Sequence, residues 1–406
     1  MQREVSYARI LLLGFGFLSI TMAWSLFNSY VPIFLRDFVE STALVGVVMS
    51  LDNVAGMTLQ PWFGALSDRT RTRIGRRMPF LVAGMPLAAV SLAALPLAGS
   101  LGLLIAAILA VDLSMSIFRA PTVALMPDLT PPGHRSRANG IINFMGGVGA
   151  FLALSGGSLL YRQGRAYPFF AAALLMLAVL VLLLRSVREP EEPTDTAQGE
   201  LSRGLWRVAV SVPRENPELL WALLGLFGWS LGLSAIEAFL TTYAVTVLGW
   251  HESEGAFLFS FFALAYILSS IPGGWVGERA GARRVLAGGL LALTLLVACA
   301  PWLRSPVTLG AGFVFAGVAW GFVTVNAYPL VVQLGSQRTI GASTGLYYLA
   351  TSLAASAGPP LAGAVMDLLG NASLFGFSAV SFFAALLCIL RSARLSQARA
   401  SIPLVH

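Results

Sequence analysis

The stretch Pro61–Phe80, PWFGALSDRTRTRIGRRMPF, places five arginines and one aspartate between two strongly apolar runs. The whole chain of 406 residues is 57% hydrophobic and only 11% charged. A soluble domain carries about 25% charged residues. Apolar runs of this length therefore indicate spans of a lipid bilayer rather than an oversized core, and the charged stretch marks a short loop at one membrane face.

Twelve apolar runs are long enough to cross the hydrocarbon layer, and a helix is the expected form of runs this long and uninterrupted. The first run is too long for the apolar part of a signal peptide, so it is read as a span. The expected spans are roughly residues 8–34, 41–64, 79–98, 101–127, 138–161, 166–185, 218–247, 253–277, 284–303, 305–333, 341–368 and 371–390.

The distribution of arginine predicts the orientation, because the chain contains no lysine. With the N-terminus in the cytoplasm, 21 of the 26 arginines fall on that side, four fall outside and Arg119 lies within a span. Basic residues prefer the cytoplasmic side of a membrane. We therefore expect a multi-pass protein with both termini cytoplasmic. The short loops and the lack of organelle signals favour a bacterial inner membrane.

A polar segment at residues 186–217 divides the chain into two sets of six spans, residues 1–185 and 218–392, and residues 393–406 form a predicted cytoplasmic tail. The two sets repeat weakly. GALSDR at 64–69 returns as GWVGER at 274–279, which is 210 residues later.

Some secondary transporters are built from parallel repeats of this kind, with the substrate site near the midplane. The sequence thus predicts an all-α membrane protein. Its twelve transmembrane helices would form two six-helix halves related by a pseudo-two-fold axis along the membrane normal.

Several classes of function are disfavoured by the residues. Cys299 and Cys388 lie alone in apolar runs, and the three histidines lie in loops or at the terminus, so no metal site is expected. No nucleophile motif or Walker-type phosphate loop is present, so we expect neither a catalytic residue nor an organic cofactor. The arginines sit in loops between spans, which argues against nucleic-acid binding. A receptor would need an extramembrane domain, and no segment is long enough for one.

The pattern G-x-x-x-[DE]-R followed by a glycine and two consecutive arginines occurs in both halves and resembles the major facilitator superfamily over the whole chain. In the first copy, the insert TRTRI separates the two parts of the pattern. This longer loop resembles that of the sucrose–proton symporters and of the glycoside–cation symporters of the melibiose type. The stretches 110–140, 326–335 and 341–367 are similar to the sucrose-type branch. The melibiose type has acidic residues for a cation on span two, where this chain has Gly56 and Gln60, so a sodium site is not expected.

This resemblance implies proton-coupled symport of a sugar such as sucrose or a related glycoside, by alternating access. The proton would be the coupling ion, and no other cofactor is implied. A proton-coupled exporter of drugs or metabolites on the same scaffold is the alternative. The expected partners are a small-molecule substrate and the bilayer, and the protein is expected to be a monomer. The sequence leaves the exact substrate, the direction and the proton stoichiometry open.

Ionisable residues at membrane depth are costly and therefore mark candidate sites. Asp112 and Arg119 lie seven residues apart on one face of the fourth span, about 10 Å apart along the helix axis. We predict that Asp112 is the proton-coupling site and that Arg119 switches it between holding and releasing a proton. The competing interpretation is a structural lock between helices.

The remaining polar and aromatic residues at membrane depth are predicted to bind substrate, since a sugar needs hydrogen-bonding groups for its hydroxyls and an aromatic face for its C–H surface. Helix contacts and packing are the alternative roles. The predicted substrate-binding residues are Asn28, Asp52, Asn53, Asn143, Glu237, Trp320, Asn326, Tyr347 and Tyr348.

The charged loop and its echo are predicted to form a gate. The resemblance implies that Asp68 meets the cytoplasmic start of span eleven, where a helix dipole favours a carboxylate. An arginine of the loop is expected to pair with Asp128. The alternative is a loop held only by the membrane preference of its arginines. The predicted gating residues are Gly64, Asp68, Arg69, Arg76, Arg77, Asp128, Gly274, Glu278 and Arg279.

Overall fold

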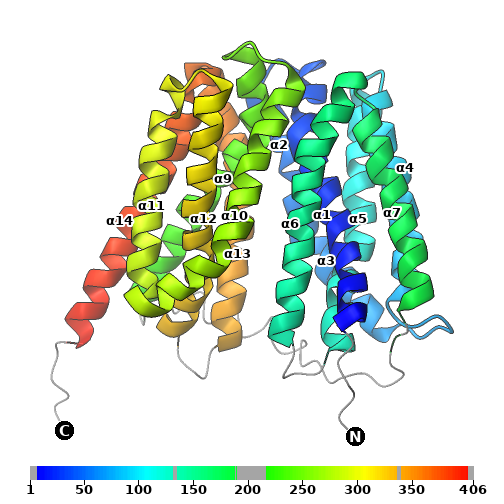
Figure 1. The fold of residues 1–406 in the computed structure, drawn as a ribbon, viewed down its shortest axis with the longest axis horizontal. Coiled ribbons are helices and arrows are strands. Elements are labelled where there is room, and N and C mark those ends of the chain that lie inside the picture. The colour runs from blue at the N-terminus through cyan, green and yellow to red at the C-terminus, as the bar shows by residue number, and fades with distance from the viewer. Residues whose placement is uncertain (1–6, 131–134, 188, 190–215, 336–339, 401–406) are drawn as a thin grey trace, which may run out of the picture. The chain divides into compact units, whose positions relative to one another are not determined.

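A computed structural model describes residues 7–130, 135–187, 189, 216–335 and 340–400, and within these ranges every regular element is a helix. The first elements are α1 Tyr7–Arg36, α2 Thr42–Met49, α3 Leu51–Arg69, α4 Met78–Ala94, η1 Leu95–Leu97, α5 Leu101–Leu129, α6 Arg135–Gln163 and α7 Tyr167–Ser186. The later elements are α9 Pro217–Thr246, α10 Glu252–Ala280, α11 Ala282–Cys299, η3 Ala300–Trp302, α12 Pro306–Leu334, α13 Ile340–Leu369, η5 Asn371–Ser373 and α14 Leu374–Ala400 (Figure 1).

Twelve stretches of the described residues are long and apolar enough to cross a membrane. They coincide with the twelve predicted spans to within several residues, so the all-helical, twelve-span prediction is confirmed. The last helix is longer than predicted, because α14 continues to Ala400 rather than ending near residue 390. The continuation, SARLSQARA, contains three alanines and two arginines, which favour a helix even where the sequence is no longer apolar.

The second span is not the single helix that its hydropathy predicts. It consists of α2 and α3, which are separated by Ser50. The Ser50 hydroxyl donates to the carbonyl of Val47 at 2.7 Å, and the Asp52 carboxylate accepts the backbone N–H of Asn53 at 2.5 Å. Side chains that bond to the backbone in this way compete with the helical ladder. The interruption therefore places Asp52 and Asn53 in the first turn of α3.

The helices form two compact units. Unit 1 comprises Met1–Thr196 with Leu240–Ser260, and unit 2 comprises Ala197–Phe239 with Phe261–His406. These units place residues 240–260 with unit 1 and divide the predicted linker 186–217 between them. The predicted boundaries of the two halves stay a prediction.

Close helix contacts in each unit depend on glycine. In unit 1, α1 packs against α6, and a Cβ on Gly149 would lie 2.3 Å from the carbonyl oxygen of Leu18. In unit 2, a Cβ on Gly317 would lie 2.4 Å from the carbonyl oxygen of Phe262. No real Cβ approaches a backbone oxygen so closely, so these positions permit contacts between helix backbones that larger residues would prevent.

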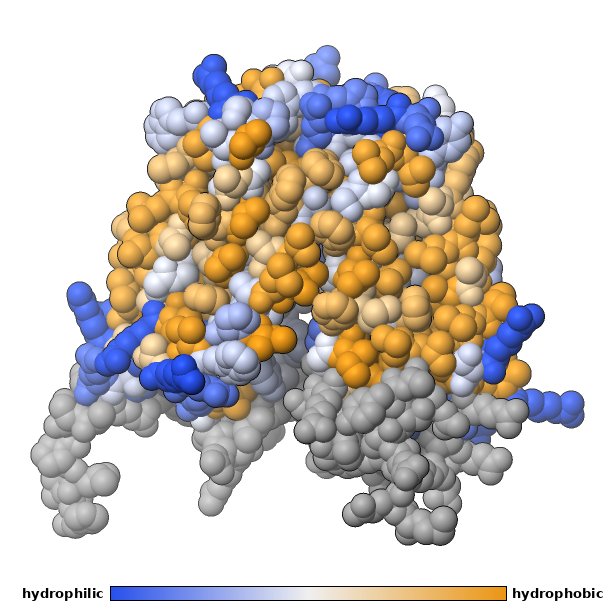
Figure 2. All heavy atoms as spheres, in the orientation of Figure 1, coloured by the Kyte–Doolittle hydropathy of each residue, from blue (hydrophilic) through white to orange (hydrophobic). Residues whose placement is uncertain are grey.

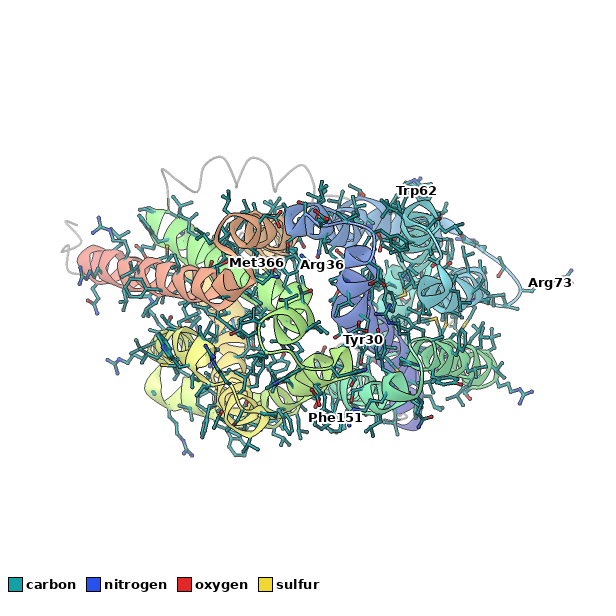
Figure 3. All side chains as sticks on the ribbon, turned by 90° about the horizontal axis from the view of Figure 1, so that it is seen from above. Tyr30, Arg36, Trp62, Arg73, Phe151 and Met366 are labelled. Atoms are coloured by element: carbon teal, nitrogen blue, oxygen red, sulfur yellow. The ribbon has the colours of Figure 1, made fainter. Side chains whose placement is uncertain are left out.

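The surface of the helices is suited to lipid. Apolar side chains cover the middle of the visible face, and hydrophilic ones gather at the helix ends (Figure 2). Trp62 on α3 is 58% exposed and Leu174 on α7 is 69% exposed. In Figure 3, Trp62 lies at the outer edge of the helices, and Arg73 lies at the end of the loop between α3 and α4. Exposed side chains of this size would be unfavourable in water and are expected in hydrocarbon.

Candidate functional site

Asp52, Asn53 and Arg119 form a polar site at membrane depth in unit 1. Asp52 is half-buried at the start of α3, and one of its carboxylate oxygens accepts from the Asn53 amide at 2.6 Å. Arg119 lies on α5, which packs against α3, and the charges of Asp52 and Arg119 act on each other. The helix interruption at Ser50 and the packing of α3 on α5 thus bring an acidic and a basic side chain together within the membrane.

Asp112 completes this group, which we call the membrane charge cluster: Asp52, Asp112 and Arg119. Asp112 lies on α5 and is 4% exposed. Both of its carboxylate oxygens are buried, and neither has a hydrogen-bond partner in the part of the chain that the structure describes. The nearby charge that acts on Asp112 is Asp52. An ionised carboxylate in this position would have neither a hydrogen bond nor a cation to stabilise it.

The electrostatic partner of Arg119 differs from the predicted one. The sequence suggests that Arg119 acts on Asp112, since both lie on one helix face. In the structure Arg119 interacts with Asp52. The reason is geometric, because two helical turns separate Asp112 from Arg119 along α5, whereas α3 carries Asp52 to the side of Arg119. Sequence spacing within one helix could not show this contact between helices.

Two other residues of unit 1, Asn28 and Asn143, are predicted to bind substrate, and they differ in exposure. Asn28 is half-buried on α1, and Asn143 is exposed on α6. Sequence reasoning missed Trp24, whose indole nitrogen is buried and has no acceptor within the described residues. Trp24 lies one turn before Asn28 on the same helix, so an aromatic ring and an amide share one face of α1. That spacing was the available signal for Trp24.

Two predicted residues of unit 2 have packing contacts. Asn326 is 4% exposed, and its amide donates to the carbonyls of Gly273 at 3.1 Å and of Phe322 at 2.8 Å. Trp320 is 9% exposed, and its ring lies 6.4 Å from that of Phe262. These placements favour the alternative roles, helix contact and packing, over substrate binding.

The predicted tyrosines of unit 2 belong to an aromatic group. The rings of Tyr347 and Tyr348 are 5.4 Å apart, and Tyr328, which was not predicted, lies 5.5 Å from Tyr347. The Tyr328 hydroxyl hydrogen-bonds to Thr344 at 3.1 Å. Tyr348 is 62% exposed, so its ring is available for contact. Glu237, also in this unit, is half-buried on α9.

A second charged group, the loop cluster, comprises Asp68, Arg76, Arg77, Asp128 and Glu189 at the end of unit 1 predicted to be cytoplasmic. Arg76 and Arg77 bind the two oxygens of Asp128 at 2.6 Å and 3.1 Å, and Arg77 also forms an ion pair with Asp68. Arg77 is only 3% exposed, so its charge depends on these carboxylates. The arrangement joins the end of α3, the start of α4 and the end of α5.

Two arginines of the loop region have different surroundings. Arg77 also donates to the Ser67 hydroxyl and to the Gly64 carbonyl, the latter at 3.4 Å. Arg69, another predicted gating residue, is exposed. The predicted contact of Asp68 with the start of span eleven would join the two units and stays a prediction.

The echo of the loop in unit 2 lacks these ion pairs. Glu278 and Arg279 are exposed at the end of α10, and neither takes part in a salt bridge within the described ranges. Gly274 is in ordinary contact, since a Cβ there would lie 3.5 Å from a methyl group of Val325. The repeat in sequence is therefore not matched by a repeated ion cluster, and the gating role of these three residues stays a prediction.

A third polar group lies at the opposite end of unit 1. Arg165 binds Asp37 at 2.8 Å and Glu252 at 2.6 Å, and the Tyr161 hydroxyl donates to Glu252. The rings of Tyr161 and Tyr30 are stacked with centroids 4.2 Å apart. Partial burial lowers the pKa of Arg165, but its neighbours Tyr161, Glu252 and Asp37 more than offset this, so the pKa is raised and Arg165 stays charged. This group was not predicted from the sequence.

The twelve spans and two compact units describe the fold, and a comparison with family models shows which family the chain belongs to. Residues 13–260 and 246–404 match the Major Facilitator Superfamily. The chain belongs to this superfamily. It is therefore a transporter with small-molecule substrates and not an enzyme, and the predicted arrangement of two halves agrees with the fold of the superfamily.

Curated relatives of this chain carry several kinds of substrate. The chain is 26% identical over 355 residues to the probable nitrate/nitrite transporter NarK2 of Mycobacterium tuberculosis, with 86% of each chain covered. It is 24% identical to the isoprimeverose transporter of Lactiplantibacillus pentosus, covering 86% of this chain and 77% of that one. It is 27% identical to the multidrug resistance protein MdtG of Citrobacter koseri, covering 80% and 82%.

Solved structures agree on the fold. The crystal structure of a mutant of the nucleoside transporter NupG superposes with a TM-score of 0.76 at 14% identity, covering 94% of this chain and 99% of that one. The family match confirms the expected membership of the superfamily. The expected sucrose-type branch is not confirmed, because the relatives include nitrate, glycoside and multidrug transporters.

Proposed function

We propose that the protein is a proton-coupled symporter of a sugar, such as sucrose or a related glycoside, that works by alternating access. The observation that carries the proposal is Asp112, a buried carboxylate without a hydrogen-bond partner in the described residues, beside the Asp52–Arg119 pair. A transporter that uses the proton gradient needs one group that can take up and release a proton within the membrane. Asp112 has the burial and the surroundings for that role.

The coupling follows from charge. When Asp112 holds a proton it is neutral, and Arg119 is balanced by Asp52 alone. When Asp112 releases its proton, two negative charges share one arginine, and the cluster carries a net negative charge at membrane depth. Such a charge is costly in hydrocarbon, so the two protonation states favour different arrangements of α3 and α5. The proton enters from outside with the sugar and leaves to the cytoplasm.

The charge balance also supports a neutral substrate. The membrane charge cluster has two carboxylates and one arginine, so its formal charge is negative or zero and it offers no net positive charge to an anion such as nitrate. The Asp52 carboxylate and the Asn53 amide, in contrast, offer acceptors and donors for hydroxyl groups. The likeness to an isoprimeverose transporter supports a sugar in particular.

A proton-coupled exporter of drugs or metabolites is the second candidate. The likeness to a multidrug resistance protein over 80% of the chain supports it. The same charge cluster could drive export if the proton and the substrate moved in opposite directions. We place either activity in the inner membrane of a bacterium, with both termini in the cytoplasm and the protein working as a monomer.

Ligand-induced stabilisation tests the substrate class. Purified protein in detergent is heated with sucrose, isoprimeverose, melibiose, nitrate or a lipophilic cation. We expect at least one of the sugars to raise the melting temperature, because a ligand at 100 times its Kd adds about 2.7 kcal/mol to the stability of the folded state.

Mannitol at the same concentration controls for the general stabilisation that excluded solutes cause. The variant Asn53→Ala should lose part of the sugar effect. Stabilisation by nitrate or by the cation, with none by any sugar, would contradict the proposed substrate class.

A further inference from the structure

Glu189 lies just beyond α7, and its carboxylate reaches the start of α4. It accepts the backbone N–H of Arg76 at 2.8 Å, that of Arg77 at 2.9 and 3.0 Å, and that of Met78 at 2.8 Å. The first N–H groups of a helix have no partner within the helix, and the side chain of the N-cap residue Arg77 does not supply one. A carboxylate from a residue more than 110 positions away does so instead.

The loop is shaped around this carboxylate. Gly75 has a φ of +115°, a conformation that residues with a side chain rarely adopt. A Cβ at Gly75 would also lie 2.5 Å from Glu189 Oε1. Both the backbone conformation and the space around Glu189 therefore require glycine before Arg76.

The residues whose backbone Glu189 holds are the same ones whose side chains form the ion pairs of the loop cluster. Arg76 and Arg77 both bind Asp128, and Arg77 also binds Asp68. Glu189 is half-buried, and Arg77 is 3% exposed. The loop cluster thus has three carboxylates and two arginines, and Glu189 is its link to α7.

We propose that Glu189 is a positioning residue for transport, which caps the start of α4 and thereby holds Arg76 and Arg77 on Asp128 and Asp68. The ends of α3, α4, α5 and α7 are then coupled through the three carboxylates and two arginines of the loop cluster. A rigid connection of this kind makes these helices move together when the transporter changes conformation. The inference rests on membership of a transporter superfamily and not on the identity of the substrate.

Hydrogen exchange tests the cap without a substrate. In Glu189→Ala, the backbone amides of residues 76–78 lose their acceptor and should exchange at least about tenfold faster than in the wild type. Glu189→Gln keeps one acceptor oxygen, so its exchange rate should lie between those of the wild type and Glu189→Ala. Arg71→Gln, which removes a charge from an exposed residue of the same loop, should leave the exchange unchanged.

Transport kinetics test the role of the cap. With whichever substrate the stabilisation screen identifies, Glu189→Ala should lower the maximal rate at least about fivefold with KM within about twofold, since a conformational step is impaired and not binding. Glu189→Asp should restore part of the rate. If Glu189→Ala does not yield folded protein, Glu189→Gln takes its place in both measurements.

Unchanged exchange at residues 76–78 would overturn the inference, and so would faster exchange with a wild-type maximal rate. A screen in which no sugar binds would reject only the sugar proposal, because the exchange measurement needs no ligand.

Discussion

The variant Asp112→Asn is expected to carry substrate across the membrane but not to concentrate it. The asparagine side chain has nearly the same size and stays neutral, so it imitates the protonated carboxyl at the centre of the cluster. Both oxygens of Asp112 are buried without a partner within the described residues, so removing its charge should not destabilise the fold. Coupling to the proton gradient should be lost, because Asp112 can no longer exchange a proton.

The measurement compares two modes of transport in proteoliposomes. Uptake driven by an imposed proton gradient should fall to the level of empty liposomes. Exchange of labelled for unlabelled substrate should stay within about threefold of the wild type, because the variant loses proton coupling and keeps substrate binding. Glu40→Gln, a change at an exposed carboxylate, is the matched control and should keep both activities. A proton-driven accumulation that survives in Asp112→Asn would show that the coupling site lies elsewhere.

The second large effect is expected for Arg119→Gln. Removing this arginine leaves Asp52 without its cation next to Asp112. Asp52 and Arg119 are both half-buried, and a carboxylate left without a nearby cation at membrane depth is costly. We therefore expect Arg119→Gln to lower the yield and the melting temperature of the protein.

Second-site variants show which carboxylate is the partner. Asp52→Asn combined with Arg119→Gln should recover most of the lost stability, since neither charge remains. Asp112→Asn combined with Arg119→Gln should recover less, because Arg119 acts on Asp52 in the structure. Each double-mutant cycle gives the coupling energy between Arg119 and one carboxylate, and the two coupling energies are then compared. A larger recovery with Asp112→Asn would contradict the interaction of Arg119 with Asp52 and favour an action of Arg119 on Asp112, as the sequence suggests.

The fold was largely predictable from sequence because each span is decided by its own hydropathy. Twelve apolar runs are enough to predict twelve helices without knowledge of any contact between them. The interruption at Ser50 could not be predicted in this way, because the span Thr42–Arg69 as a whole is still apolar enough to cross a membrane. It arises from local bonds of Ser50 and Asp52 to the backbone, which a hydropathy pattern does not record.

The site was predictable where membrane depth alone gives the signal. Asp112 and Arg119 stand out because charge is rare in a span, and both belong to the cluster. Their partners depend on contacts between helices, so the pairing of Arg119 with Asp52 was missed. Glu189 was missed for the same reason, since more than 110 residues separate it from the amides that it caps. Asn326 shows that an amide within a span can also serve a neighbouring helix, which membrane depth alone does not reveal.

Part of the loop cluster was predicted through the resemblance to other transporters. The expected pairing of a loop arginine with Asp128 is seen for both Arg76 and Arg77. The similar stretch in unit 2 led to the expectation of a second gate, but Glu278 is exposed there. The repeated motif covers only the loop, whereas Asp128, which binds the loop arginines in unit 1, comes from another helix.

The central claim is that a proton gradient drives the uptake of a neutral sugar. The most direct measurement is accumulation of labelled sucrose or isoprimeverose in proteoliposomes with an acidic outside, with and without a protonophore. We predict that the internal concentration rises above the external one and returns to equality when the protonophore is added. Equal concentrations throughout, or accumulation that the protonophore does not abolish, would contradict this claim.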